Sequence, residues 1–316
     1  MSNEKQKLKI ILSEPRGFCA GVERAIETVK KTIEKYGAPV YVRHEIVHNK
    51  HVLEELKALG AVFVESLNQA PDDRPIIFSA HGVAKEIPLE AKRREMIAID
   101  ATCPLVSKVH REAEAHYRRG YKIIMIGHKN HAEVIGTMGQ LPKGAISLIE
   151  KKEDIAKLGL KPSENIAYIT QTTLSIDDTK EIINELKKTF PNIKTPKKED
   201  ICYATTNRQT AVKMAATKAE LFIIIGSKNS SNSQRLVEVA KNNGCPRAML
   251  IDSVQEINWD DIKNIKTLAI SAGASAPEIL VKEVLARAEE IFNLEIEKIS
   301  TATEDIVFKI PLSLTR

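Results

Sequence analysis

Residues 10–29 read IILSEPRGFCAGVERAIETV. The β-branched apolar run predicts a strand, the turn after it carries Cys19, and apolar residues at helical spacing then predict a helix. The same order returns at residues 98–117 around Cys103 and at residues 201–216 around Cys202. A strand, a cysteine-bearing turn and a helix that recur three times indicate α/β layering with mainly parallel strands.

Each copy of this repeat continues in the same way. A second strand ends in a polar loop, and a third strand ends in small polar residues. The second strands and their loops lie at residues 41–56, 123–136 and 222–239, and the third strands lie at residues 76–83, 166–177 and 268–279. We expect strands at 9–12, 40–42, 76–79, 122–126, 166–169, 221–225 and 267–270, and helices at 21–36, 107–119, 206–217, 232–242 and 277–292.

The repeat predicts the domain organisation. We expect three similar α/β domains around a pseudo-threefold axis, covering residues 1–102, residues 103–200, and residues 201–316 with a C-terminal tail. Ligand groups in α/β units gather where strands end and helices begin. If the three carboxyl edges face one centre, Cys19, Cys103 and Cys202 converge on one point. Cys245 lies outside the repeat and is expected to be a packing thiol.

Composition restricts the class of protein. The 316 residues carry 47 Lys and Arg against 42 Asp and Glu, a net charge of +5 spread along the chain. With 43% hydrophobic and 28% charged residues, the chain reads as globular rather than disordered. Aromatic residues reach only 4%, which disfavours a base-stacking surface for nucleic acid. No apolar run approaches membrane-spanning length and no secretory signal is visible, so we expect a soluble cytoplasmic protein.

Three converging thiolates indicate metal chemistry. No C-x-x-C pair is present, and disulfides are unexpected in a reducing compartment. Thiolates without local histidine ligands suit an iron–sulfur cluster. A cubane with three cysteine ligands keeps its fourth iron open, as catalytic metal sites keep a vacant position. A zinc site of three cysteines and one histidine remains an alternative at this point.

Polar loops would line the same centre. His48, His81 and His131 each follow a strand, whereas the third copy carries Ser230, Ser231, Asn232 and Ser275 at the matching places. Residues 230–232 precede a helical pattern, and residues 275–278 resemble a capping box with proline in the first turn. Because helix N-termini attract anions, these segments predict a phosphate or diphosphate pocket.

One carboxyl group lies within these loops. Glu133 stands two residues after His131, and a carboxyl near a desolvated site has a raised pKa and serves as a general acid. Thr172, in the loop TQTTLS, is expected to orient a substrate hydroxyl or relay a proton. Capping of a helix remains the simpler role for each residue taken alone.

These motifs resemble the 4-hydroxy-3-methylbut-2-enyl diphosphate reductase family over nearly the whole chain. The similar segments are PRGFCAGV (15–22), VRHEIVHN (42–49), DATCPLV (100–106), GHKNHAEVIG (127–136), TQTTLS (170–175), ATTNRQ (204–209) and SKNSSNSQRL (227–236). The resemblance implies a trefoil of three α/β domains around one iron–sulfur cluster. We expect only peripheral departures from the family, namely a short polar N-terminal extension, Cys245, and no appended RNA-binding domain of the kind that some relatives carry.

The resemblance also implies roles for individual residues. Cys19, Cys103 and Cys202 match the three ligands of one 4Fe–4S cluster. Glu133 matches the proton donor, and Thr172 matches a substrate contact. The residues that match contacts to the diphosphate and the rest of the substrate are His48, His81, His131, Ser230, Ser231, Asn232 and Ser275.

The implied reaction is the reductive dehydroxylation of (E)-4-hydroxy-3-methylbut-2-enyl diphosphate to isopentenyl and dimethylallyl diphosphate. It is the last step of the methylerythritol phosphate route to isoprenoids. An acidic electron donor such as ferredoxin or flavodoxin would suit the slightly basic chain. Two rivals remain at this stage, namely a non-catalytic iron–sulfur redox sensor and a zinc-dependent phosphate-ester hydrolase. A sensor needs no substrate pocket, so the polar loops disfavour it.

Overall fold

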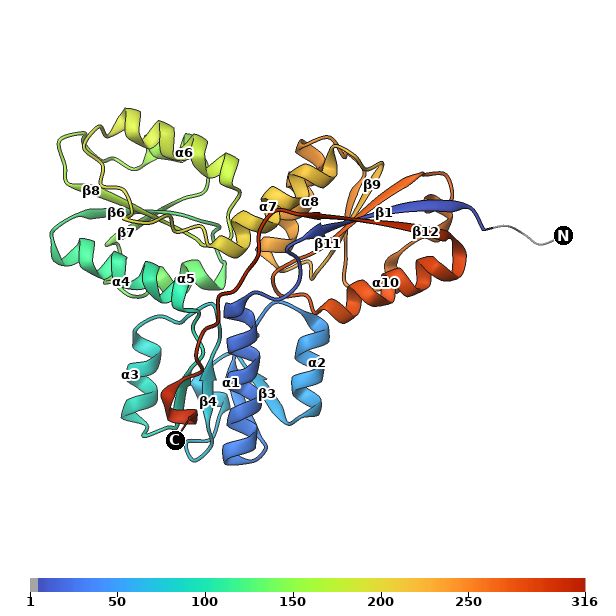
Figure 1. Ribbon diagram of the computed structural model, residues 1–316. Coiled ribbons are helices and arrows are strands. Elements are labelled where there is room, and N and C mark those ends of the chain that lie inside the picture. Colours follow the sequence, from blue (N-terminus) through green and yellow to red (C-terminus); the bar gives the residue numbers. More distant parts are fainter. Residues whose placement is uncertain (1–4, 316) are drawn as a thin grey trace. The chain divides into compact units, whose positions relative to one another are not determined.

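The computed structural model describes residues 5–315, which form two compact units (Figure 1). Unit 1 contains residues 5–19, His48–Val52 and Tyr203–Ile306. Unit 2 contains Ala20–Val47, Leu53–Cys202 and residues 307–315. Each unit consists of parallel strands with flanking helices, so the expected α/β class is confirmed. In the described part of the chain, no helix is long and apolar enough to cross a membrane.

The strands form three parallel sheets, one in unit 1 and two in unit 2. Sheet A of unit 1 has the order β10-β9-β11-β1-β12, with β1 at Lys7–Glu14, β9 at Leu221–Ile225, β10 at Ala248–Ile251, β11 at Thr267–Ala272 and β12 at Asn293–Ser300. Sheet B has the order β3-β2-β4-β5, with β2 at Val40–Arg43, β3 at Ala61–Val64, β4 at Ile76–Phe78 and β5 at Ala98–Asp100. Sheet C has the order β7-β6-β8, with β6 at Lys122–Ile126, β7 at Ile146–Ile149 and β8 at Ile166–Thr170.

Helices connect the strands. They are α1 at Ala20–Tyr36, α2 at Lys50–Ala58, α3 at Glu86–Arg93, α4 at Pro104–Arg118, α5 at Ala132–Met138, α6 at Ile176–Thr189, α7 at Tyr203–Ala216, α8 at Ser231–Asn242, α9 at Trp259–Ile262 and α10 at Glu278–Ile291. The expected strands and helices all occur, with small differences at their ends. The helix expected from Ser107 begins at Pro104, because proline fits the first turn, where its missing N–H costs no hydrogen bond.

The inner strands of sheet A are buried on both faces, as expected for a parallel sheet covered by helices, whereas the edge strand β12 is largely exposed. Leu8 and Ile10 of β1 belong to one apolar cluster with residues of α10. Ile11 points to the opposite face and joins a cluster with residues of α7 and α8. The near-continuous apolar run of β1 therefore reflects a central strand with both faces covered.

The segment before Cys103 and the segment before Cys202 each pair with a strand of the preceding copy of the repeat. The strand before Cys19 pairs with strands near the end of the chain. β5, before Cys103, pairs with β4, and Lys194, before Cys202, forms a bridge with Ala167 of β8. β1, before Cys19, pairs with β11 and β12. β1 is therefore part of sheet A, whereas the sequence predicts it in the first domain, with residues 15–102. Its buried faces explain the difference, and the three-domain division remains a proposal.

Candidate functional site

Each of the three repeat cysteines is tied through its backbone to a loop that follows a strand. The N–H of Cys19 donates to the carbonyl of Ala274 at 3.2 Å, in the loop after β11. The N–H of Cys103 donates to Ala80 at 2.9 Å, after β4, and that of Cys202 donates to Thr172 at 3.0 Å, after β8. Three equivalent bonds thus join the cysteine turns to the loops that carry Ser275, His81 and Thr172.

The environment of these cysteines fits thiolate ligands. Cys19, Cys103 and Cys202 are half-buried, and each directly precedes the first residue of α1, α4 or α7. A helix N-terminus stabilises negative charge on sulfur. Cys245 is fully buried in an apolar cluster, and burial raises the pKa of its thiol. Exposure and position therefore distinguish three candidate ligands from one packing residue. None of these four described cysteines forms a disulfide.

In unit 2, Glu133 and Thr172 are joined by two hydrogen bonds. The backbone N–H of Thr172 donates to Glu133 Oε1 at 2.7 Å, and its hydroxyl donates to Oε2 at 2.9 Å. Glu133 is the second residue of α5, whose N-cap is His131, and the Glu133 N–H donates to His131 Nδ1 at 3.1 Å. Because Thr172 also binds the N–H of Cys202, one loop connects the carboxyl group to a candidate ligand.

The carboxyl group of Glu133 is poised to exchange a proton near neutral pH. Glu133 is only 2% exposed to solvent. Burial raises its pKa to about 7, an effect that the negative charge of Asp200 reinforces and the hydrogen bonds from Thr172 oppose. A carboxylic acid with a pKa of about 7 is about half protonated at neutral pH, so it can act as a general acid.

Two histidines of unit 2 lie beside each other. The rings of His81 and His131 meet edge to face, with centroids 5.9 Å apart. His81 Nδ1 lies 3.5 Å from the hydroxyl of the buried residue Ser79 at the end of β4. The structure thus brings His81, His131, Glu133 and Thr172 together at the carboxyl edges of sheets B and C.

In unit 1, His48 lies between two polar loops. Its carbonyl accepts a hydrogen bond from the Ser275 hydroxyl at 2.9 Å, and its Nδ1 lies 3.4 Å from Asn229 Nδ2. The expected capping box at residues 275–278 is wrong, since the N-cap of α10 is Pro277 and no side chain caps this end. The Ser275 hydroxyl instead joins the loop after β11 to His48.

The start of α8 leaves a buried amide without a partner. Ser230 is the N-cap, and its hydroxyl oxygen accepts from the N–H of Ser233 at 3.3 Å. Asn232 is 5% exposed, and neither its Nδ2 nor its Oδ1 has a hydrogen-bond partner. A buried unsatisfied amide costs about 1–3 kcal/mol, so such a group at a helix N-terminus indicates a polar ligand. Ser231 occupies the first helical position beside it.

The structure distributes the predicted site residues over the two units. Unit 1 holds Cys19, His48, Ser230, Ser231, Asn232 and Ser275, and unit 2 holds His81, Cys103, His131, Glu133, Thr172 and Cys202. Within either unit, the described residues contain no group of three or more His, Cys, Asp or Glu positioned for a metal ion. The roles of the individual residues therefore stay predictions.

Sequence reasoning missed several buried polar residues next to these loops. Gln171 is fully buried, and its Oε1 accepts from the N–H of His128 at 3.0 Å. Asp200 is buried and binds Lys108 Nζ at 2.8 Å, and Arg208 is fully buried beside the Cys19 turn. Their position in the sequence could have revealed them, because each stands next to or within a motif that carries a predicted site residue.

Comparisons with known proteins agree with this geometry. The family model described as LytB protein matches residues 10–289. The chain is 56% identical over 313 residues to the 4-hydroxy-3-methylbut-2-enyl diphosphate reductase of Methylocella silvestris, covering 99% of this chain and 98% of the relative. The reductase of Phenylobacterium zucineum is 57% identical over 307 residues, covering 97% and 98% respectively.

Solved structures show the same similarity. The E-1-hydroxy-2-methyl-but-2-enyl-4-diphosphate reductase from Plasmodium falciparum matches with a TM-score of 0.91 and 39% identity, over 99% of this chain and 97% of that one. A structure of (E)-4-hydroxy-3-methyl-but-2-enyl diphosphate reductase, described as the terminal enzyme of the non-mevalonate pathway, matches with a TM-score of 0.65 and 33% identity, over 90% of this chain and 100% of that one. The family resemblance read from the motifs is confirmed, and the chain belongs to the LytB family of 4-hydroxy-3-methylbut-2-enyl diphosphate reductases.

Proposed function

We propose that this chain reduces (E)-4-hydroxy-3-methylbut-2-enyl diphosphate to isopentenyl diphosphate and dimethylallyl diphosphate. Two electrons and two protons enter, the allylic C–O bond breaks, and the hydroxyl leaves as water. One proton completes that water molecule and the other ends on carbon. The observation that carries the proposal is the Glu133–Thr172–Cys202 connection, which places a buried acid with a pKa of about 7 one loop away from a candidate ligand.

Membership of this family implies an iron–sulfur cofactor. We propose that Cys19, Cys103 and Cys202 hold one 4Fe–4S cluster whose fourth iron has no protein ligand. Such a cluster supplies Lewis acidity and single electrons when it is bound. The half-buried sulfurs at three helix starts support this choice of ligands.

The diphosphate is proposed to bind at the start of α8. Asn232 offers a buried amide that no protein group satisfies, and Ser230 and Ser231 stand at the helix N-terminus, where backbone N–H groups attract anions. Ser275 and His48, joined by a hydrogen bond, lie in the same unit. His81 and His131 are proposed as further substrate contacts, because their rings adjoin each other beside Glu133.

Glu133 is proposed to deliver a proton after substrate has bound. Thr172 holds both carboxyl oxygens, so it fixes the orientation of the acid. Because burial favours the neutral form, the carboxyl group keeps its proton until the reaction develops negative charge nearby. We propose that Thr172 aims the acid through these two bonds and also contacts the substrate.

The partner is proposed to be a small acidic electron carrier such as ferredoxin or flavodoxin, because an enzyme of this class needs electrons one at a time. The net charge of +5 favours an acidic partner electrostatically. We also propose that the protein works in the cytoplasm, where thiols stay reduced and single-electron carriers are available.

Anaerobic purification tests the proposal. The full chain should be brown, should contain iron and sulfide in equal amounts at about four of each per chain, and should consume the diphosphate substrate when a reduced one-electron donor is added. A colourless chain with stoichiometric zinc would contradict the proposal and favour the hydrolase reading. A cluster without turnover under any donor would favour the redox sensor.

A further inference from the structure

A cation follows each repeat cysteine at nearly the same spacing. Arg24 stands five residues after Cys19 on α1, Lys108 five residues after Cys103 on α4, and Arg208 six residues after Cys202 on α7. Each side chain donates to at least two backbone carbonyls of the segment that leads into the next repeat cysteine. Arg24 also donates to the carbonyl of Lys309 at 2.8 Å, and Arg208 also donates to that of Ala204 at 3.0 Å.

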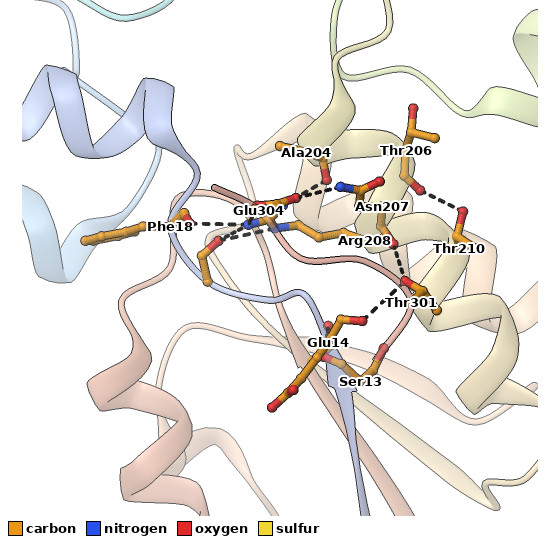
Figure 2. Close-up of polar contacts among 12 residues, drawn as sticks. Ser13, Glu14, Phe18, Ala204, Thr206, Asn207, Arg208, Thr210, Thr301 and Glu304 are labelled. Carbon is orange, nitrogen blue, oxygen red and sulfur yellow. Dashed lines mark hydrogen bonds and ion pairs between the residues drawn. The ribbon is translucent and has the colours of Figure 1, made fainter. Parts of the chain in front are cut away.

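Arg208 shows this contact most completely (Figure 2). Its side chain is fully buried, and its guanidinium donates to the carbonyl of Gly17 at 2.7 Å and to that of Phe18 at 3.3 Å. Gly17 and Phe18 are the two residues before Cys19. Gly17 has a φ of 72°, in the left-handed region that favours glycine, so this turn has an unusual backbone that the arginine holds.

A carboxylate balances the buried charge of Arg208. Glu304 lies 3.0 Å from Arg208 Nη1 and accepts a second bond from Asn207 Nδ2 at 3.0 Å. Thr301, three residues earlier, donates through its backbone N–H to the carbonyl of Glu14 at 3.1 Å. Its hydroxyl donates to the same carbonyl at 3.3 Å (Figure 2). The segment after β12 therefore contacts the start of this turn directly, at Glu14, and its end through Arg208.

Arg24 makes the corresponding contact in unit 2. Its Nη1 donates to the carbonyl of Thr102 at 3.0 Å, the residue directly before Cys103. Its Nη2 reaches the carbonyl of Asp100 at 3.4 Å, and the charges of Asp100 and Cys103 both interact favourably with the guanidinium. The arginine thus contacts the backbone of the turn and adds positive potential at the candidate ligand.

Lys108 completes the set. Its Nζ donates to the carbonyls of Lys198 at 2.6 Å and Glu199 at 3.0 Å, and to the Asp200 carboxylate at 2.8 Å. Asp200 in turn accepts from the N–H of Thr170 at 2.9 Å. The lysine therefore anchors the segment before Cys202 to the end of β8.

We propose that Arg24, Lys108 and Arg208 are positioning residues, each of which fixes the backbone that presents the next repeat cysteine. The helix of Cys19 holds the turn of Cys103, the helix of Cys103 holds the segment of Cys202, and the helix of Cys202 holds the turn of Cys19. The inference rests on the proposed function in one respect, since it treats these cysteines as the ligands of one cluster.

Cations suit this task for two physical reasons. Hydrogen bonds from a charged donor to carbonyl groups are stronger than neutral ones, so they hold an irregular turn in one conformation. A thiolate at a helix start is also stabilised by a nearby positive charge. Loss of one cation should therefore loosen one cysteine turn and weaken one ligand, while the helix that carried the cation stays formed.

Amide hydrogen exchange on the anaerobically purified full chain tests the proposal. Arg208→Met should speed exchange in residues 16–19, Arg24→Met in residues 100–103 and Lys108→Met in residues 198–202. Each acceleration should be about 10- to 100-fold, the effect of losing hydrogen bonds to a charged group. Iron release to a chelator should rise by a similar factor in each variant.

Two further variants act as controls. Arg94 resembles the three cations, because it donates to the Ala70 carbonyl at 3.2 Å and to Asp72 at 2.8 Å. The segment that it holds, however, does not lead into a cysteine turn. Arg94→Met should loosen residues 68–72 and leave iron release unchanged. If Arg208→Met fails to fold because Glu304 is left buried without its partner, Arg208→Lys keeps the charge and should show a smaller acceleration at the same residues.

The outcomes separate this inference from the proposed function. Acceleration confined to the next cysteine turn supports it. Wild-type exchange in all three turns, or acceleration that spreads evenly through the unit, overturns it even if the wild-type chain holds its cluster and turns over. A wild-type chain without iron and sulfide would instead overturn the proposed function, while hydrogen exchange would still report on the three contacts.

Discussion

The carboxyl group of Glu133 combines burial with a fixed orientation. Both oxygens accept hydrogen bonds from Thr172, and burial nevertheless raises the pKa to about 7. A residue that merely capped α5 would gain nothing from burial, because the His131 side chain already caps this helix. The arrangement is better explained by proton delivery than by helix stability.

Replacing Glu133 with Gln should lower turnover by about 10²–10⁴-fold while substrate still binds, because the amide keeps the size but has no proton to give. Single-turnover kinetics under anaerobic conditions measure this loss. Asp177→Asn, at an exposed acid in the first turn of α6, is the matched control and should be neutral. Near-normal turnover in Glu133→Gln would assign the acid role elsewhere.

The pH dependence of turnover follows from the same pKa. A proton donor is active in its protonated form, which predominates below about pH 7 and falls tenfold per pH unit above it. We expect turnover by the wild-type chain to decline as pH rises through about 7, provided that proton transfer limits the rate. Glu133→Gln should lose this limb, and a limb of unchanged position in that variant would contradict the assignment.

Cysteine replacements separate sulfur chemistry from folding. Cys103 is the N-cap of α4, and serine is a favourable N-cap, so Cys103→Ser should keep the thermal midpoint of the cluster-free chain yet lose most iron and sulfide. Cys245→Ser should keep the iron, since Cys245 lies in an apolar cluster. Metal and sulfide analysis of both variants decides the matter, and full cluster content in Cys103→Ser would refute the ligand assignment.

At the scale of elements, the start of α8 is built for a ligand rather than for stability. Ser230 caps the helix, while the adjacent Asn232 buries an amide with no protein partner. Protein interiors rarely tolerate such groups without compensation. The compensation is expected to come from the diphosphate.

Replacing Asn232 with Leu should therefore weaken substrate binding about 10- to 100-fold without lowering the thermal midpoint. Asn243, at the other end of α8, is the matched control, because its Nδ2 donates to the Val239 carbonyl at 2.8 Å. Asn243→Leu should cost about 1 kcal/mol of stability and leave the Michaelis constant unchanged. If Asn232→Leu destabilises the chain and binds substrate normally, the amide is a structural group.

The elements themselves were largely predictable. Strands β6 and β9 have the expected ends because each apolar run is bounded by a charged residue before it and a glycine after it. Short strands such as β3 and β7 were not predicted, since four residues give no clear period. The site residues were found by repetition of motifs, whereas Arg208, Lys108 and Asp200 were not, because their role depends on contacts between distant segments.

At the scale of the whole molecule, unit 1 is discontinuous in sequence. β1 comes from the start of the chain and lies between β11 and β12, which come from the last fifty residues or so. No local pattern could reveal this partner, because a buried parallel strand looks the same in any sheet. The repeat predicts three similar α/β domains, but it does not reveal that β1, the strand before Cys19, pairs with the last strands of the chain.

Removal of residues 1–14 should unfold unit 1. The deletion takes Leu8, Ile10 and Leu12 from one face of sheet A and Ile11 from the other, and each large apolar loss costs about 2–5 kcal/mol against a typical total of 5–15 kcal/mol. Limited proteolysis should cut within residues 221–300 and spare residues 122–170. Protection of β9 in the shortened chain would contradict the central role of β1.

The most direct test of the account is the reaction itself, run anaerobically in deuterated water with a reduced one-electron donor. The full chain should convert (E)-4-hydroxy-3-methylbut-2-enyl diphosphate to isopentenyl and dimethylallyl diphosphate, each with one solvent deuterium on carbon and with the diphosphate intact. Release of phosphate with the hydroxyl retained, or no conversion by a chain loaded with iron and sulfide, would contradict it.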